Sequence, residues 1–323
     1  MNWLKKSVFA VFIFKVFLTS NCISQRFDLF FIYLKSYEHS ASNLFIRGRT
    51  LFSSFSNVLS IHDITDPQDP KPLTSHTFEK DISDFYVSGN LIFVATDKIY
   101  LLYLSRDYLN EVTRIDIEAK KIEVYGDLLY ALSMDQIFVV NVGDVHNPKV
   151  AKFNVESILD FTSDGEIIYI ATGNNLIFSR VEGDEIKFLG KTEKRALKVA
   201  LGSGVLSLMT PEFYIEILDV SSINQPEVRE RSYHQAASSN IMVVQGNFIF
   251  NEVEDSEIMV NKIEYETLNE GTPPGLFPVG VFYKGDSSYS AKVKDVSGLF
   301  PYVYVATGER VDIFKMFVKE TTR

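Results

Sequence analysis

The sequence predicts an all-β fold, a seven-bladed β-propeller made of four-stranded antiparallel blades. A turn motif that ends in proline occurs three times, closing at Pro70, Pro148 and Pro226. These prolines are spaced by about two periods of 39 residues, which is in the range typical of propeller blades. In parallel, a β-type run, a glycine turn and a second β-type run recur along the chain. No long stretch beyond the N-terminal segment has capped helical periodicity.

Each predicted unit has the same internal order. A first strand, such as Ile82–Val87, turns at a glycine into a second strand of β-branched and aromatic residues, such as Leu91–Thr96. A third strand ends in the turn motif, and a fourth follows the proline, as in Val150–Val155. Seven glycines mark the expected hairpins: Gly48, Gly89, Gly126, Gly165, Gly204, Gly246 and Gly298.

The turn motif has a structural explanation. An Asp or Asn side chain at its start can accept a hydrogen bond from the backbone two residues on, which closes an Asx turn. The closing proline fixes φ and removes a donor just before an outermost strand. We therefore expect structural roles, with a catalytic or ligand-binding role as the alternative, for Asp63, Pro70, Asn141, Pro148, Asp219 and Pro226.

These motifs carry a family resemblance. Residues Ile61–Pro70 resemble the LVIVD propeller repeat, in which a hydrophobic strand ends in Asp-Val-Ser-Asn-Pro-x-x-Pro. Leu218–Pro226 and Val140–Pro148 are similar to it, although Ile223 and Val145 stand where the first proline is expected. The resemblance implies a propeller fold and implies almost nothing about activity.

The ring is expected to close through an N-terminal strand. The last unit supplies three strands, at Lys292–Val296, Tyr302–Thr307 and Val311–Phe317, and lacks a fourth. The β-rich run Phe27–Lys35 has no place in the first unit, so we predict that it pairs beside Val311–Phe317. This pairing would remove two open sheet edges at once. The alternative is a loose stalk.

The N-terminus has the features of an export signal. Lys5 and Lys6 precede the apolar stretch Val8–Leu18, which is short for a membrane span and is interrupted by Lys15. We therefore assign residues 1–21 to a signal peptide, 22–26 to a tether and 27–323 to a single propeller domain.

The only cysteine, Cys22, follows this apolar core directly. The arrangement resembles the relaxed lipoboxes of spirochaete lipoproteins, because Leu18 and Asn21 depart from the strict pattern. The resemblance implies lipidation at Cys22 and anchoring to a bacterial membrane, with the outer membrane favoured, since buried acyl chains hold a protein firmly. The alternative is a soluble secreted or periplasmic protein.

Composition narrows the classes of partner. The formal net charge of −10 argues against nucleic acid, because phosphate binding needs a basic surface. Signal-peptide removal would take away three lysines and make the chain more acidic. The folded domain has no cysteine of its own, so disulfides are not expected to stabilise it. We expect a monomer.

The sequence contains no convincing catalytic or metal motif, and we predict no catalytic residue, metal or cofactor. There is no Gly-x-Ser-x-Gly and no phosphate loop before a helix. The acidic run Glu252–Glu257 fits a solvated turn better than a calcium site, and Asp160, Asp164 and Glu166 fit an edge turn. The five histidines show no metal spacing: His39, His62, His76, His146 and His234.

The segment Tyr265–Tyr289 departs most from the repeat, because it lengthens one unit with a Pro/Gly-rich stretch at 269–278. Long insertions in compact rings are often functional. We name as weak candidates for partner binding Pro273, Pro274, Phe277 and Tyr283. A tolerated surface loop is the alternative.

Together these features predict an exported, lipid-anchored binding or scaffold module with an unknown protein or carbohydrate partner. The competing hypothesis is a propeller enzyme that acts on a polysaccharide or small polar substrate in the central channel. It requires acidic, basic or histidine side chains from several blades to converge at one channel mouth. A passive envelope component is a third interpretation.

Overall fold

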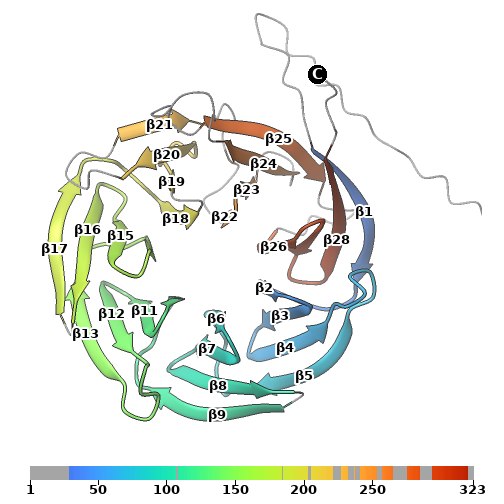
Figure 1. The fold of residues 1–323 in the computed structure, drawn as a ribbon, viewed down its shortest axis with the longest axis horizontal. Coiled ribbons are helices and arrows are strands. Elements are labelled where there is room, and N and C mark those ends of the chain that lie inside the picture. Colours follow the sequence, from blue (N-terminus) through green and yellow to red (C-terminus); the bar gives the residue numbers. More distant parts are fainter. Residues whose placement is uncertain are drawn as a thin grey trace, which may run out of the picture.

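The computed structural model describes residues 29–106, 108–183, 185–202, 205–220, 227–231, 236, 241–252, 257–264, 275–283 and 293–318. These residues form seven four-stranded antiparallel sheets arranged in a ring around a central axis (Figure 1). The predicted all-β, seven-bladed propeller is therefore confirmed. The described residues contain no helix that is long and apolar enough to cross a membrane.

The strands are numbered along the chain, and each blade is given from its innermost to its outermost strand. Blade 1 consists of β2 (Asn43–Arg47), β3 (Thr50–Phe55), β4 (Val58–Asp63) and β5 (Lys71–Thr77), and blade 2 of β6 (Asp84–Ser88), β7 (Leu91–Ala95), β8 (Ile99–Ser105) and β9 (Tyr108–Ile115). Blade 3 consists of β10 (Lys121–Tyr125), β11 (Leu128–Ser133), β12 (Gln136–Asn141) and β13 (Lys149–Asn154), and blade 4 of β14 (Asp160–Ser163), β15 (Ile167–Ala171), β16 (Leu176–Glu182) and β17 (Glu185–Thr192). Blade 5 consists of β18 (Lys198–Gly202), β19 (Val205–Met209), β20 (Ile215–Asp219) and β21 (Glu227–Arg231), and blade 6 of β22 (Met242–Gln245), β23 (Phe248–Glu252), β24 (Glu257–Glu264) and β25 (Gly275–Tyr283). Blade 7 consists of β26 (Asp295–Leu299), β27 (Tyr302–Ala306), β28 (Val311–Val318) and β1 (Leu29–Tyr37).

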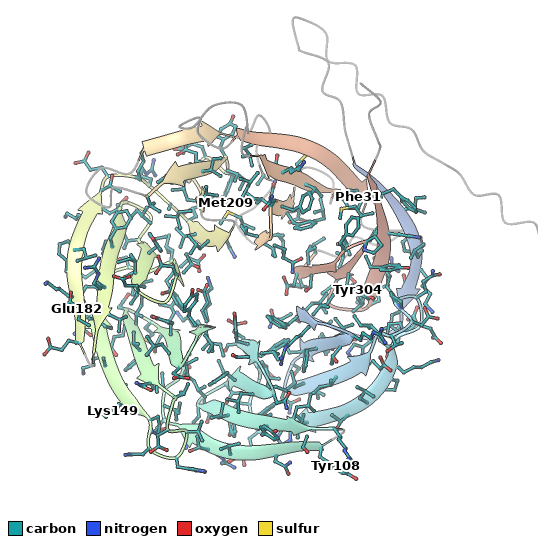
Figure 2. The ribbon with its side chains drawn as sticks, in the orientation of Figure 1. Phe31, Tyr108, Lys149, Glu182, Met209 and Tyr304 are labelled. Carbon is teal, nitrogen blue, oxygen red and sulfur yellow. The ribbon has the colours of Figure 1, made fainter. Side chains whose placement is uncertain are left out.

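The hydrophobic core lies between the blades. Seven apolar clusters are formed, and each joins side chains of two neighbouring blades. The second strands, such as β15, are buried on both faces because each face meets another blade. Figure 2 shows Met209 and Tyr304 inside the ring, where both are fully buried, and Tyr108, Lys149 and Glu182 at its perimeter.

The N-terminal strand closes the ring as predicted. Strand β1 pairs antiparallel with β28, from Leu29 opposite Val318 to Tyr37 opposite Val311. A polar contact fixes this seam, because Ser36 Oγ donates to Asp312 Oδ1 at 2.6 Å and Arg310 Nε donates to the same oxygen at 2.9 Å. Asp312 is fully buried, so the carboxylate ties β1 to the last blade within the protein interior.

Two expectations about local structure are wrong. Gly298 lies within β26 opposite Val303, and the hairpin turn falls at Phe300–Pro301. A glycine at 298 instead gives room for Gln245, whose Oε1 accepts the Gly298 N–H at 2.7 Å and would lie 3.0 Å from an added Cβ.

The second correction concerns the expected insertion in blade 6. Residues Gly275–Tyr283 are not loop but form β25, which pairs with β24 as the outermost strand of the blade. A one-residue irregularity between Val260 and Asn261 accommodates Pro278 in this pairing. Residues 265–274 and 284–289 lie outside the described residues.

Replacement of Asp312 by alanine tests the polar contact at the closure. We expect the free energy of unfolding to fall by about 1–3 kcal/mol, because the Ser36 hydroxyl and the Arg310 guanidinium lose a buried acceptor. Chemical denaturation measures this change. The matched control is Asp116→Ala, since the Asp116 side chain is 92% exposed and should change stability little. Equal stability of the two variants would contradict the assignment.

Candidate functional site

A cavity lies at one mouth of the central channel. It has a volume of about 830 Å³, and its lining includes the first residues of all seven inner strands and segments that lead into them. Residues of blades 1 to 7 contribute to it, including Asn43, Asp84, Lys121, Asp160, Lys198, Met242 and Asp295. Each of these seven residues is the first residue of its inner strand, so the repeat itself places them in one ring.

Three aspartates of this ring accept a backbone hydrogen bond from the next blade, and we call these three contacts aspartate clasps. Asp84 Oδ2 accepts the N–H of Ile122 at 2.8 Å, Asp160 Oδ2 accepts that of Val199 at 3.0 Å, and Asp295 Oδ2 accepts that of Leu44 at 2.7 Å. In every case the donor is the second residue of the next blade's inner strand. The same contact therefore holds blades 2 and 3, 4 and 5, and 7 and 1 together.

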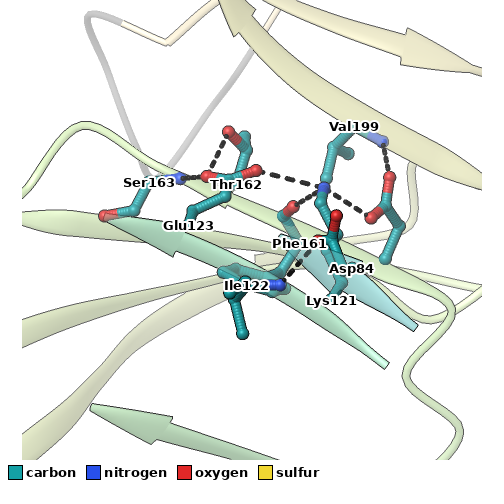
Figure 3. Close-up of polar contacts among 9 residues, drawn as sticks. Asp84, Lys121, Ile122, Glu123, Phe161, Thr162, Ser163 and Val199 are labelled. Atoms are coloured by element: carbon teal, nitrogen blue, oxygen red, sulfur yellow. Dashed lines mark hydrogen bonds and ion pairs between the residues drawn. The ribbon is translucent and has the colours of Figure 1, made fainter. Parts of the chain in front are cut away.

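Lys121 forms the centre of a second polar contact (Figure 3). Its Nζ lies 2.8 Å from Asp160 Oδ1, 3.1 Å from Glu123 Oε1 and 2.6 Å from the carbonyl oxygen of Phe161. These partners use all three donors of the ammonium group. Glu123 Oε2 also accepts hydrogen bonds from Thr162 Oγ1 and Ser163 N, each at 3.1 Å. Lys121 and Glu123 are thus committed to the contact with blade 4.

The enclosed position of the ring shifts its acid–base equilibria. Burial raises the pKa of Asp84 to about 7 and that of Asp295 to about 6, although each accepts two backbone N–H groups that act in the opposite direction. Burial also raises the pKa of Glu123. Burial alone would lower the pKa of Lys121, but Asp160 and Glu123 outweigh it and raise that pKa.

Lys198 differs from Lys121 because nothing neutralises it at close range. Among the described residues, its ammonium group has no hydrogen-bond or ion-pair partner, and burial lowers its pKa. It contributes to the cavity lining beside Ala200, Met242 and Val244, which form an apolar wall on blades 5 and 6. The cavity therefore combines fixed charges with one uncharged side.

The rim of the cavity carries two exposed apolar side chains. Met134, in the turn between β11 and β12, is 70% exposed, and Leu159, just before β14, is 50% exposed. Lys120 and Lys294 lie on the same rim and are also exposed. The mouth is thus an apolar and basic surface around a charged interior.

The predicted turn residues lie at the opposite end of the blades. Asp63 Oδ1 accepts the Thr65 N–H at 2.8 Å, and Asn141 Oδ1 accepts the Gly143 N–H at 3.0 Å, as an Asx turn requires. Pro70 and Pro148 directly precede the outermost strands β5 and β13. Asp219 is the last residue of β20, but its side chain is not described. Pro226 lies outside the described residues. None of the four described residues lines the cavity.

Of the other predicted site residues, the two that lie in a described strand are away from the channel. Phe277 and Tyr283 lie in β25 at the perimeter of the ring (Figure 1), opposite Lys262 and Glu257. Pro273, Pro274 and Cys22 lie outside the described residues. A partner-binding role for these residues, and lipidation of Cys22, remain predictions.

The sequence pattern does not predict the channel ring and places Asp160 in an edge turn. Asp160 instead begins the inner strand β14 and is buried at the channel. A signal was available, because Asp84, Lys121, Asp160 and Lys198 alternate in charge at successive repeats. The expected turn does contain Asp164 and Glu166, between β14 and β15.

The structure also brings two histidines together near the ring closure. The rings of His39 and His62 lie 4.5 Å apart between centroids, and Tyr37 of β1 contacts both. His39 Nε2 is 2.8 Å from Ser53 Oγ, whereas His62 Nδ1 is buried without a partner in the described residues. No group of His, Cys, Asp and Glu side chains in the described part of the chain could hold a metal ion.

Comparison with solved structures identifies the same fold. The β-propeller domain of Cps50 (Swd1) from Myceliophteria thermophila has a TM-score of 0.65 and 13% identity, covering 88% of this chain and 99% of that one. The N-terminal domain of Nup159 has a TM-score of 0.61 and 10% identity, covering 91% and 97%. The computationally designed protein Ika8 has a TM-score of 0.60 and 8% identity, covering 88% and 98%.

These identities are too low to indicate more than the fold. No protein-family profile and no curated protein sequence matches the chain. The chain is a β-propeller.

The histidine pair predicts a pH dependence of stability. Burial, and to a lesser extent His39, lowers the pKa of His62 from 6.5 to about 4. Between these values the unfolded chain binds a proton that the folded chain excludes, so the free energy of unfolding falls as pH decreases from 6.5 to 4. The contribution of His62 is about 3 kcal/mol over this window.

Denaturation of the protein and of His62→Gln at several pH values measures this contribution. The loss of stability between pH 6.5 and 4 should be smaller in the variant, because glutamine does not titrate. His76→Gln is the control, since His76 lies on the outermost strand of the same blade, away from the closure. A variant with an unchanged pH dependence would exclude His62 as the source.

Proposed function

We propose that this propeller is an exported, lipid-anchored binding module of the bacterial envelope, whose ligand occupies the cavity at the channel mouth. The observation that supports this function most is the cavity itself, which is about 830 Å³ and carries charged groups from several blades. This volume is within the range of small-molecule sites, which combine apolar walls with a few fixed polar groups.

The rigidity of the ring favours binding. The aspartate clasps and the Lys121 contact hold the charged groups in place through backbone N–H donors and ion pairs. Groups that are already ordered lose little conformational freedom when a ligand arrives, so more of the interaction energy appears as affinity. The cavity is thus suited to a small polar ligand.

The position of the N-terminus is compatible with an anchor. Strand β1 lies at the perimeter of the ring (Figure 1). A fully extended chain of the length between Cys22 and Leu29 spans about 25 Å. A lipid at Cys22 would therefore hold the protein by its edge and leave the channel mouth open. The LVIVD resemblance and the relaxed lipobox support a bacterial envelope protein, with the outer membrane favoured.

An enzyme of the channel is the second candidate function. The convergence that this hypothesis requires is present, because Asp84, Glu123, Asp160 and Asp295 share one cavity with lysines. The raised pKa of Asp84, about 7, is suitable for general acid–base chemistry. We favour binding because loss or gain of a proton at any of these three aspartates would disturb the backbone hydrogen bonds that its carboxylate accepts between blades.

Mass spectrometry of the mature N-terminus tests the anchor. In a bacterial host that processes lipoproteins, we expect a chain that begins at Cys22 and carries diacylglycerol, with the protein in the membrane fraction. Cys22→Ser should abolish the modification and release the protein from the membrane. A mature chain that begins at Ile23 or Gln25 would exclude lipidation and favour simple secretion.

Filling the cavity tests the binding function. Protein exposed to a small-molecule extract of its producing cells should retain a compound in native mass spectrometry. Ala200→Trp should lose this compound, because Ala200 lines the cavity wall. The control Ala151→Trp, on the outermost strand β13, should retain it. Equal retention by both variants would exclude the cavity, and recovery of a chemically altered compound would support the enzyme instead.

A further inference from the structure

The charges that line the cavity are balanced, although the chain as a whole is acidic. Of the described lining residues, four are carboxylates and four are lysines: Asp84, Glu123, Asp160 and Asp295, with Lys120, Lys121, Lys198 and Lys294. The whole chain has a formal net charge of −10. A balanced cavity has no net preference for a simple anion or a simple cation, and it suits a ligand that carries both signs.

Internal pairing reduces the groups that are available to a ligand. Lys121 pairs with both Asp160 and Glu123, at 2.8 and 3.1 Å. No described ion pair within 4 Å involves Asp84, Asp295 or Lys198, and none involves Lys120 or Lys294, which lie exposed on the rim. Inside the mouth, Asp84, Asp295 and Lys198 carry the charges that a ligand could still satisfy.

The two free carboxylates lie on one side of the ring. Asp84 begins the inner strand of blade 2 and Asp295 that of blade 7, with Asn43 of blade 1 between them. Each of the two carboxylate oxygens of Asp84, and each of the two of Asp295, accepts one described backbone N–H. Since a carboxylate oxygen has two acceptor positions, each can accept another hydrogen bond from an ammonium group.

The unpaired lysine inside the mouth, Lys198, lies on the other side. Lys198 begins the inner strand of blade 5, two blades from Asp295 and three from Asp84. Beside it, Ala200, Met242 and Val244 give the cavity an apolar wall. This side can therefore receive a carboxylate together with the short methylene chain that carries it.

We propose that the cavity binds a small zwitterion, with a primary ammonium at Asp84, Asn43 and Asp295 and a carboxylate at Lys198. The proposal rests on the function proposed above and names its ligand class. It assigns the two ends of the ligand to opposite sides of the channel and its aliphatic part to the wall of blades 5 and 6.

Isothermal titration calorimetry with amino acids of increasing length tests this assignment. The probes are glycine, 4-aminobutyrate and 6-aminohexanoate, and hexylamine and hexanoate are controls that carry one charge each. At least one amino acid should bind, and at least tenfold more tightly than either control. Absence of binding by all three amino acids, or equal binding of either control, would overturn the proposal.

Two variants locate the two ends of the ligand, and a third is their control. Lys198→Met should weaken binding of the amino acid at least tenfold without unfolding the protein, because Lys198 has no described partner to lose. Asp295→Asn should weaken it similarly. Lys187→Met, at a side chain 63% exposed on β17, is the control and should bind normally. Unchanged affinity of a folded Lys198→Met protein would contradict the assigned carboxylate site.

The test separates this proposal from the broader function. If the amino acids fail while Ala200→Trp still removes a compound captured from the extract, the cavity is a binding site for another class of ligand. If both experiments fail, the binding function itself is wrong.

Discussion

The structure depends on apolar contact between neighbouring sheets. Each of the seven core clusters draws its side chains from two blades, so a sheet removed from the ring would expose both faces. The cluster in which Leu51 and Ile64 of blade 1 pack against Tyr304 and Ile313 of blade 7 completes the ring of contacts between blades. Stability is therefore shared by the whole ring.

The polar ring at the channel follows from the same constraint. Inner strands converge at the centre, where the sheets are narrowest and backbone N–H groups of neighbouring blades approach each other. Asp84, Asp160 and Asp295 satisfy such groups from the side, and the space that remains between the blades is the cavity. Stability and the proposed ligand binding thus use the same residues, which limits how far the ring can change to suit a new ligand.

Much of the fold was predictable because it repeats. The turn at Asp63, the strand Leu91–Ala95 and the pairing of the N-terminal run with 311–317 follow from local spacing and from the need to remove sheet edges. The hairpin near Gly298 was misplaced, because the glycine serves a contact with Gln245 of another blade, which local sequence does not reveal.

The candidate site was harder to predict, for a physical reason. Its members are separated by whole repeats, and a single Asp before a strand resembles a turn residue until the ring brings several together. The meeting of His39 and His62 likewise depends on the path of the chain after β1.

The pairing of β1 with β28 joins two strands that are separated by all the other blades in the sequence. During synthesis, β1, the leading strand of this pair, therefore has no partner until β28 has been made. Circularisation is thus a late event in the life of the nascent chain. A truncated chain that lacks β28 would leave β1 without a hydrogen-bonded partner. Such a chain would be a substrate for quality-control proteases.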